Sequence, residues 1–289
     1  MKRFSDYHPA VLMLYFAATI LLCAFSSDPV TAALALLGGV LFCAARRAVR
    51  LSDLGFYLGL GALIALSNPL FVHNGVTPLF FMNDNPVTLE AIVCGIGTAA
   101  TLIAVLLWCR CYNSVMTSDK FLYLFGRVLP RSALIFSMAL RYVPLLRRQA
   151  RKTERAQTVL GLYTTESWLG RVRAKLSVLS ALIGWSLENA IAVSAAMKAR
   201  GYGAKGHTSY SNYRFTWRDG LLLALVLLFG GAYVLLMQLC GTYAYYPSLR
   251  APTGAAAYAA YAAFAALSLA PFLIETEEAL RWNYLRSKI

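Results

Sequence analysis

The sequence predicts an all-α integral membrane protein with about six transmembrane helices and two long cytoplasmic helices. Hydrophobic residues make up 59% of the 289 residues and charged residues only 14%, whereas charged residues approach a quarter of a soluble domain. Residues 113–218 contain 17 Lys and Arg against four Asp and Glu, which is nearly all of the net charge of +14. One large basic insert between hydrophobic spans gives the chain a defined orientation in a membrane.

Six apolar stretches are the expected spans, at residues 11–25, 29–45, 54–66, 87–108, 220–239 and 255–274. A helix needs about 20 apolar residues to cross the hydrocarbon core. The last three are long enough, and the third is expected to recruit Leu51 or Asn68-Pro69 at its ends. The chain therefore divides into four spans in residues 1–112, the cytoplasmic region in 113–218, and two spans with a short tail in 219–289.

Basic residues outside the insert indicate the orientation of the spans. Lys2 and Arg3, the cluster Arg46, Arg47 and Arg50, and Arg110 lie on the same side as Arg281, Arg286 and Lys288, and the opposite side holds only Arg250. Lys and Arg remain in the cytoplasm, so both termini are expected there. A cleaved signal peptide in the first segment is the alternative, but its removal would leave five spans and invert this pattern.

The spans carry no ionisable residue at their centres, and Glu90 lies in the first turn of the fourth. Ion-coupled transporters usually need such a group at membrane depth. Walker, serine-elbow and H-E-x-x-H motifs are absent, and the Cys and His spacings suggest neither disulfides nor a metal site. We therefore expect no enzyme activity and no cofactor, and expect any energy to come from a partner.

Two helices are expected within the basic insert. The first follows Pro130 to about Gly161 and presents Arg147, Arg151 and Arg155 on one face; a surface facing anionic lipid would also explain this stripe. The second, at about 171–200, has small residues at helical spacing that permit close packing, namely Ser177, Ser180, Ala181 and Gly184. Gly201 is expected to end it in the left-handed conformation, and Arg200 could simply cap its own helix.

Several motifs in order resemble one membrane-protein family. They are Asn68-Pro69-Leu70-Phe71, His73-Asn74-Gly75, Thr77-Pro78-Leu79-Phe80, Ser118-Asp119-Lys120-Phe121, Leu129-Pro130-Arg131, the segment from Leu140 to Leu146, and Ala196-Met197-Lys198-Ala199-Arg200-Gly201-Tyr202-Gly203. The sequence resembles the transmembrane T component of energy-coupling factor (ECF) transporters, a family of prokaryotic cell-membrane proteins that includes the cobalt-transporter Q subunit.

The resemblance implies a set of partners. Two cytoplasmic ATP-binding-cassette subunits bind and hydrolyse ATP, and one small membrane subunit, the S subunit, captures a vitamin or metal ion. The T component joins them through two coupling helices, here 131–161 and 171–201, and membrane lipid surrounds it; no nucleic-acid partner is expected. The implied ATPase-docking residues are Arg151, Arg155, Ala156, Gln157, Leu160, Gly161, Ala196, Ala199, Arg200 and Gly201. The implied crossing and hinge residues are Arg141, Pro144, Ser177, Ala181 and Gly184.

The first docking motif departs from the family. Leu160 stands where an Arg usually precedes the Gly, and Lys198 replaces a commonly acidic residue. We therefore expect unequal docking, with apolar contact at Leu160 supported by Arg151 and Arg155.

Two other function classes compete with the coupling subunit. An integral membrane enzyme acting on a lipid or polyprenyl substrate would need paired acids or a His cluster, whereas Asp119, Glu154 and Glu188 are dispersed. A secondary transporter is disfavoured by the uncharged span centres. The small-residue stretch 255–266 is expected to pack within the chain, with contact to the S subunit as the alternative.

Overall fold

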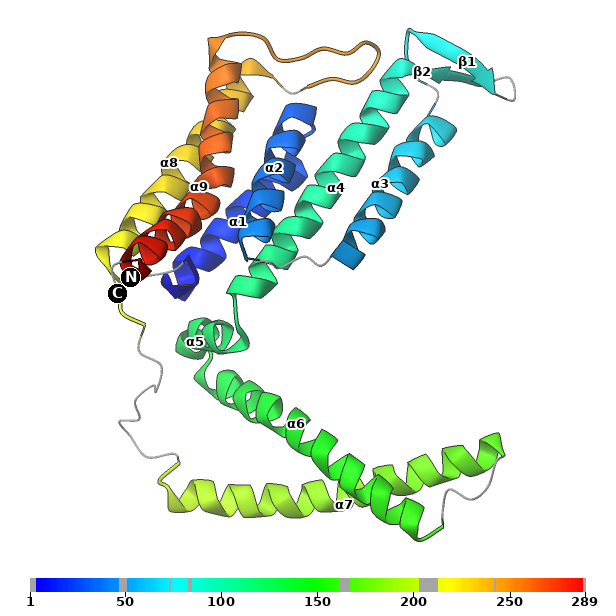
Figure 1. Ribbon diagram of the computed structural model, residues 1–289, viewed down its shortest axis with the longest axis vertical. Coiled ribbons are helices and arrows are strands. Elements are labelled where there is room, and N and C mark those ends of the chain that lie inside the picture. The colour runs from blue at the N-terminus through cyan, green and yellow to red at the C-terminus, as the bar shows by residue number, and fades with distance from the viewer. Residues whose placement is uncertain are drawn as a thin grey trace. The chain divides into compact units, whose positions relative to one another are not determined.

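A computed structural model describes residues 4–46, 51–72, 74–82, 85–161, 167–202, 213–241 and 243–287 (Figure 1). The chain forms two compact units. The membrane unit comprises Met1–Phe121 and Tyr213–Ile289, and the helix-pair unit comprises Leu122–Asn212. The helix-pair unit lies inside the predicted cytoplasmic region.

The membrane unit contains a helix for each of the six predicted spans. They are α1 (Pro9–Phe25), α2 (Pro29–Arg46), α3 (Leu51–Phe71), α4 (Leu89–Val115), α8 (Trp217–Cys240) and α9 (Ala255–Arg286). A 3-10 turn, η1 (Phe4–Asp6), precedes α1. The third span does recruit residues at both ends, because α3 starts at Leu51 and continues through Asn68-Pro69. The all-α membrane fold is thus confirmed, with α9 reaching twelve residues beyond the predicted end of its span.

Five described helices, α2, α4, α7, α8 and α9, are long and apolar enough to cross a membrane, and α1 and residues Gly55–Phe71 are shorter apolar helices. The presence of α7 (Trp168–Ala199) in this group differs from the prediction that it lies in the cytoplasm. The apolar surface of α7 could be in contact with lipid or with another protein. Length and composition therefore do not assign α7 to the membrane or to the cytoplasm.

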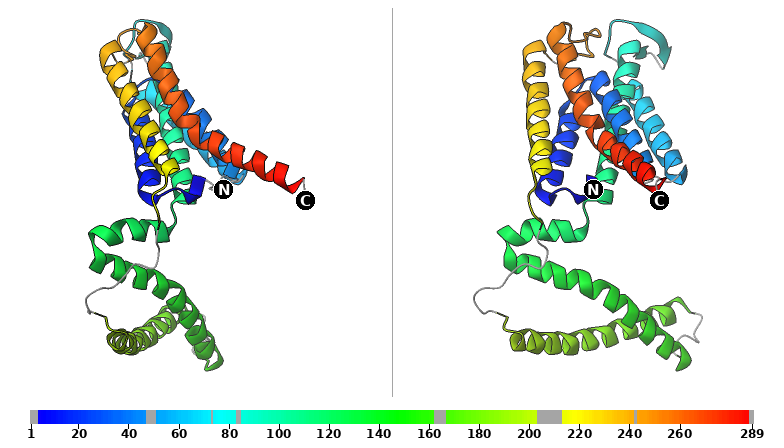
Figure 2. Two further views of the ribbon diagram at one scale, coloured as in Figure 1. Left: turned by 90° about the vertical axis from the view of Figure 1, so that its left-hand side faces the viewer. Right: turned by 60° about the vertical axis from the view of Figure 1, so that its left-hand side comes forward.

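Packing within the membrane unit follows the order α3, α4, α2, α9 and α8, with α1 against α4 and α8 (Figures 1 and 2). An aromatic cluster forms its core, in which Phe4 contacts Tyr15, Phe16 and Phe42 edge to face. Such edge contacts suit the quadrupoles of aromatic rings.

Polar groups in the core are bonded to neighbouring helices. Trp108 Nε1 donates to Ala35 O at 3.0 Å, and Tyr15 OH donates to Leu267 O at 2.8 Å. Backbone oxygens thus accept hydrogen bonds from side-chain donors whose burial without a partner would cost free energy. These bonds join α4 to α2 and α1 to α9.

The short connection between α3 and α4 contains two antiparallel strands, β1 (Pro78–Met82) and β2 (Asn85–Thr88). Glu90 at the start of α4 accepts a hydrogen bond from Thr77 Oγ1 at 2.8 Å, and Thr88 Oγ1 donates to Asn74 O at 2.9 Å. These bonds give a structural explanation for the loop motifs around Asn74 and Thr77. The strands were not expected from the sequence.

The small-residue stretch of α9 packs inside the membrane unit, as expected. Ala257, Ala260 and Ala263 are buried, whereas Tyr258 is exposed. Helix α9 contacts both α2 and α8. Small side chains allow this close approach of helix backbones.

The helix-pair unit consists of most of α5 (Ser118–Val128) together with α6 (Pro130–Val159) and α7. Pro130 occupies the first turn of α6, where its missing N–H costs nothing. The Ser167 side chain caps α7 by accepting from Gly170 N at 3.1 Å. Helices α6 and α7 pack against each other.

Candidate functional site

The two long helices of the helix-pair unit end in the same way. At the end of α6, Leu160 N donates to Ala156 O and Gly161 N donates to Thr158 O, and Gly161 has a φ of +80°. A left-handed residue at this position turns the chain away from the helix, and glycine adopts it without a steric penalty. The end of α6 therefore projects Leu160 as its last side chain.

The end of α7 carries a complete glycine-based terminator. Gly201 N donates to Lys198 O, Tyr202 N donates to Met197 O, both at 3.0 Å, and Gly201 has a φ of +79°. This pair of bonds is the Schellman motif. The prediction that Gly201 ends the helix in the left-handed conformation is confirmed. Arg200 is the last residue before the turn, as Leu160 is in α6.

The predicted docking residues are mostly exposed. Leu160 is 77% exposed, and Gly161 is half-buried. The other exposed members of the set are Arg151, Arg155, Ala156, Ala196, Ala199, Arg200 and Gly201. Two helix ends thus present small or apolar residues beside arginines. This combination suits an acidic, partly apolar surface on another protein.

The arginines at these ends have no acidic partner within the described part of the chain. Arg151, Arg155 and Arg200 are exposed, and none takes part in an ion pair there. A guanidinium presents five donors in a planar fork and stays charged. The alternative role for Arg200 was to cap its own helix. Its backbone N–H does donate to Ala196 O, but this bond does not involve the guanidinium.

Gln157 differs from the other predicted docking residues because it faces α7. It is 9% exposed, and its Nε2 donates to Ser177 Oγ at 3.1 Å. Ala174 and Val178, which share a face of α7 with Ser177, are also buried. One part of the contact between the two helices is therefore made near the end of α6.

The predicted crossing residues are only partly brought together. Ser177 lies in the contact, whereas Arg141, Pro144, Ala181 and Gly184 are exposed. A side chain added at Gly184 would meet nothing within 4 Å. Arg141 and Pro144 on α6 and Ala181 and Gly184 on α7 are thus not buried in the contact between the helices, so their role at a crossing stays a prediction.

The sequence interpretation missed a second bond between the helices. Asn189 Nδ2 on α7 donates to Tyr142 OH on α6 at 3.0 Å. A hollow of about 310 Å3 follows it, lined by Met138, Tyr142, Met197 and Tyr202 among others. The sequence offers little signal for this bond, because Asn189 follows the charged residue Glu188 and its side chain could equally face solvent.

No group of three or more His, Cys, Asp or Glu side chains that could hold a metal ion gathers among the described residues. Both ends of the helix pair expose arginines beside small or apolar residues. The arrangement can bind a partner and transmit a movement along rigid helices.

Comparison with known proteins identifies relatives. The "energy-coupling factor transporter transmembrane protein EcfT" of Bacillus selenitireducens is 36% identical over 102 residues, and that of Brevibacillus brevis is 36% identical over 92 residues. The uncharacterized protein MG181 of Mycoplasma genitalium is 28% identical over 163 residues. No protein-family model matches the chain.

These similarities cover part of each protein. The matches to the two EcfT proteins span 35% and 31% of this chain and 38% and 35% of the relatives. The match to MG181 spans 52% of this chain and 39% of that protein. The chain thus spans little more than a third of the length of the curated relatives it matches.

Proposed function

We propose that this chain is the coupling subunit of an ECF-type importer, and its similarity to several EcfT proteins supports this proposal. Two ATPase subunits bind and hydrolyse ATP, and a separate S subunit captures a vitamin or metal ion. The chain itself catalyses no reaction and holds no cofactor. It transmits the movement of the ATPases to the S subunit.

The single observation that carries this proposal is the matched pair of helix ends at Leu160-Gly161 and Arg200-Gly201. Each ends in a left-handed glycine and exposes its last side chain. A subunit that is moved by two similar ATPase subunits needs two similar contact points, each at the end of a long helix. Helices α6 and α7 supply rods of 30 and 32 residues.

Exposed apolar residues on the helix pair support a further partner. Helix α7 exposes large side chains along its length, and α6 does so in its first half; they are Leu176, Leu179, Ile183, Leu187, Ile191, Ile135, Phe136 and Leu140. Contiguous apolar surface of this kind marks an interaction site. In this proposal the S subunit and lipid contact this apolar surface.

Movement at the ATPases would reach the membrane unit through the contact between α6 and α7. Closure of two ATPases around ATP would draw the ends at Gly161 and Gly201 together. The Gln157–Ser177 and Tyr142–Asn189 bonds lie on the contact face between the rods. They would keep the two helices in contact while their ends move, so that the helices pivot against each other and pass the movement on.

Replacement of Arg200 tests the proposal. Truncating one side of a buried charge-assisted contact costs about 2–5 kcal/mol, which corresponds to roughly 30-fold or more in association. Arg200→Ala should therefore reduce recovery of the ATPases in copurification and abolish ATP-dependent uptake, with normal insertion in the membrane. Arg148→Ala, at an exposed arginine in the middle of α6 and outside the predicted docking set, is the matched control.

Uptake at the native rate in Arg200→Ala would contradict the role given to this residue. Failure of any ATPase to copurify with the native chain would contradict the proposed function as a whole. An integral membrane enzyme or a secondary transporter would be recovered without stoichiometric ATPases, so the same experiment separates the three classes.

Leu160→Arg tests the unequal docking proposed for the two ends. This change restores the arginine usual in the family, and ATPase association should stay equal or become tighter. The measurement is the amount of ATPase retained on the immobilised chain as salt is raised, because a new ion pair adds salt dependence. A large loss of association would instead indicate an apolar pocket that receives Leu160.

A further inference from the structure

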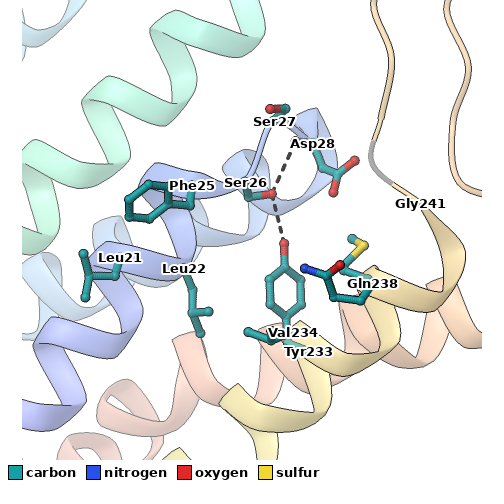
Figure 3. A pocket seen from close by; sticks show the side chains of 11 residues that line it. Leu21, Leu22, Phe25, Ser26, Ser27, Asp28, Tyr233, Val234, Gln238 and Gly241 are labelled. Atoms are coloured by element: carbon teal, nitrogen blue, oxygen red, sulfur yellow. Dashed lines mark hydrogen bonds between the residues drawn. The ribbon is translucent and has the colours of Figure 1, made fainter.

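A groove of about 540 Å3 runs between the ends of α1 and α8 in the membrane unit (Figure 3). One of its walls is apolar and comes from both helices: Leu21, Leu22, Phe25, Val234 and Met237. Phe25 is 86% exposed, and Leu21 and Val234 are also exposed. In a membrane such side chains contact hydrocarbon. The groove is therefore open to lipid along one side.

The other end of the groove is polar and lies where α1 gives way to α2. Tyr233 OH donates to Ser26 Oγ at 2.9 Å and lies 3.1 Å from Thr31 Oγ1. The single Tyr233 proton is used on Ser26, so Thr31 donates to Tyr233. Figure 3 shows Ser26, Asp28 and Gln238 around this hydroxyl. The chain of hydroxyls fixes the polar end on α8.

Asp28 is the unsatisfied group of this site. It is 4% exposed, it lines the groove, and its Oδ1 has no hydrogen-bond partner among the described residues. Burial raises the pKa of Asp28, and hydrogen bonds with the Tyr243 backbone and the Ser26 side chain oppose that rise. A buried carboxylate is costly without a paired cation, and no Lys or Arg is among the residues that line the groove.

We propose that this groove binds a phospholipid whose headgroup carries a primary amine, with the ammonium on Asp28 and an acyl chain against Leu21, Phe25 and Val234. The site joins an apolar wall to a carboxylate at the ends of two spans, and lipid headgroups lie at that depth. A ligand with a cationic head and a long apolar tail matches both parts. The inference does not depend on the proposed function.

A primary amine fits better than a quaternary one. An ammonium has three N–H donors, and Asp28 Oδ1 and the Gln238 amide oxygen are acceptors at the polar end. A trimethylammonium group has the same charge but no N–H to donate. Phosphatidylethanolamine should therefore bind more tightly than phosphatidylcholine with the same acyl chains.

Native mass spectrometry of the purified chain can measure this preference. Palmitoyl-oleoyl phosphatidylethanolamine and palmitoyl-oleoyl phosphatidylcholine are titrated separately into delipidated protein, and bound lipid is counted. A hydrogen-bonded charged contact corresponds to a preference of about ten-fold or more. Equal affinity of the native chain for the two lipids would overturn the proposal.

Asp28→Asn keeps the shape of the side chain and removes its charge, so the preference for phosphatidylethanolamine should disappear. Glu188→Gln, which removes an exposed acid from α7, should keep it. If Asp28→Asn does not fold, Val234→Trp serves instead, because it fills the apolar wall from an exposed position and should abolish tight binding of the lipid. A preference that survives Asp28→Asn or Val234→Trp would place the lipid elsewhere and overturn the assignment.

Photo-crosslinking identifies the occupant in native membranes. Benzoylphenylalanine in place of Phe25 keeps an aromatic ring in the groove, and it should yield a phosphatidylethanolamine adduct on the complete assembly. Crosslinking to a protein subunit would show that a partner occupies the groove, and the lipid proposal would fail. The native mass measurement on the chain alone is independent of partners, so it also remains informative if the proposed function is wrong.

Discussion

Lys120 shows how one residue of a recognised motif can act inside the fold. It is buried, and its Nζ donates to Val115 O at 2.9 Å and to Ser5 O. Burial lowers the pKa of Lys120, and the two carbonyl oxygens stabilise its charged form. The bonds tie the end of α4 to the turn before α1. The Ser118-Asp119-Lys120-Phe121 motif therefore has a structural role that needs no partner.

Lys120→Met should destabilise the membrane unit while retaining the apolar stem of the side chain. Loss of hydrogen bonds from a charged donor costs about 1–3 kcal/mol, so the midpoint of thermal denaturation in detergent should fall by several degrees. Lys152→Met on the exposed face of α6 is the control and should leave it unchanged. Equal midpoints for the two variants would show that the hydrogen bonds of Lys120 do not contribute to the stability of the membrane unit.

Close approach between α2 and α9 is the clearest constraint at the scale of an element. A Cβ atom at Gly38 would lie 2.7 Å from Ser268 O and 3.0 Å from Ser268 Cβ. Backbone atoms cannot move aside cheaply, so the two helices must separate if any side chain is added. The small residues of α9 and the glycine of α2 together determine the packing distance.

Gly38→Ala should therefore be destabilising, by about 1–3 kcal/mol as for other overpacked sites. Gly59→Ala on α3 is the matched control, because a Cβ there meets nothing within 4 Å. An alanine in an unobstructed helix is favoured over glycine by about 0.5–1 kcal/mol, so the two variants should shift the melting midpoint in opposite directions. A gain in stability for both would show that α2 and α9 are not in close contact.

The distribution of charge is the property of the whole molecule that sets its topology. The basic insert and the basic residues near both termini predict one cytoplasmic side. Within the membrane unit, the β1–β2 connection and the segment after α8 lie at the end opposite to the start of α1 and the end of α9 (Figure 1). Nearly all the charge of +14 lies in one insert, so the preference for one orientation should be strong.

Single cysteines in a background without the six native ones test this orientation. Thr253→Cys, in the loop between α8 and α9, should react with a membrane-impermeant thiol reagent on intact cells. Ser287→Cys and Lys175→Cys should react only after the cells are permeabilised. Labelling of Ser287→Cys on intact cells would contradict a cytoplasmic C-terminus, and labelling of Lys175→Cys would contradict a cytoplasmic helix pair.

The sequence by itself determined what depends on neighbouring residues. Apolar runs define the six spans because crossing hydrocarbon requires about 20 apolar residues in succession. Gly201 and Gly161 end their helices because only glycine adopts the left-handed conformation without penalty. The motifs also carried the family resemblance, since they are read in order along the chain.

Only the tertiary structure decided which residues meet across helices. Gln157 was expected on a docking surface but lies against Ser177. The sequence places Asp28 only in the loop after the first span, whereas in the fold it lines a groove with Tyr233 of α8. The physical reason is that the rotation and register of a helix depend on packing with partners distant in sequence. A pattern of residues gives the face of a helix, but the neighbour that covers this face is a property of the folded molecule.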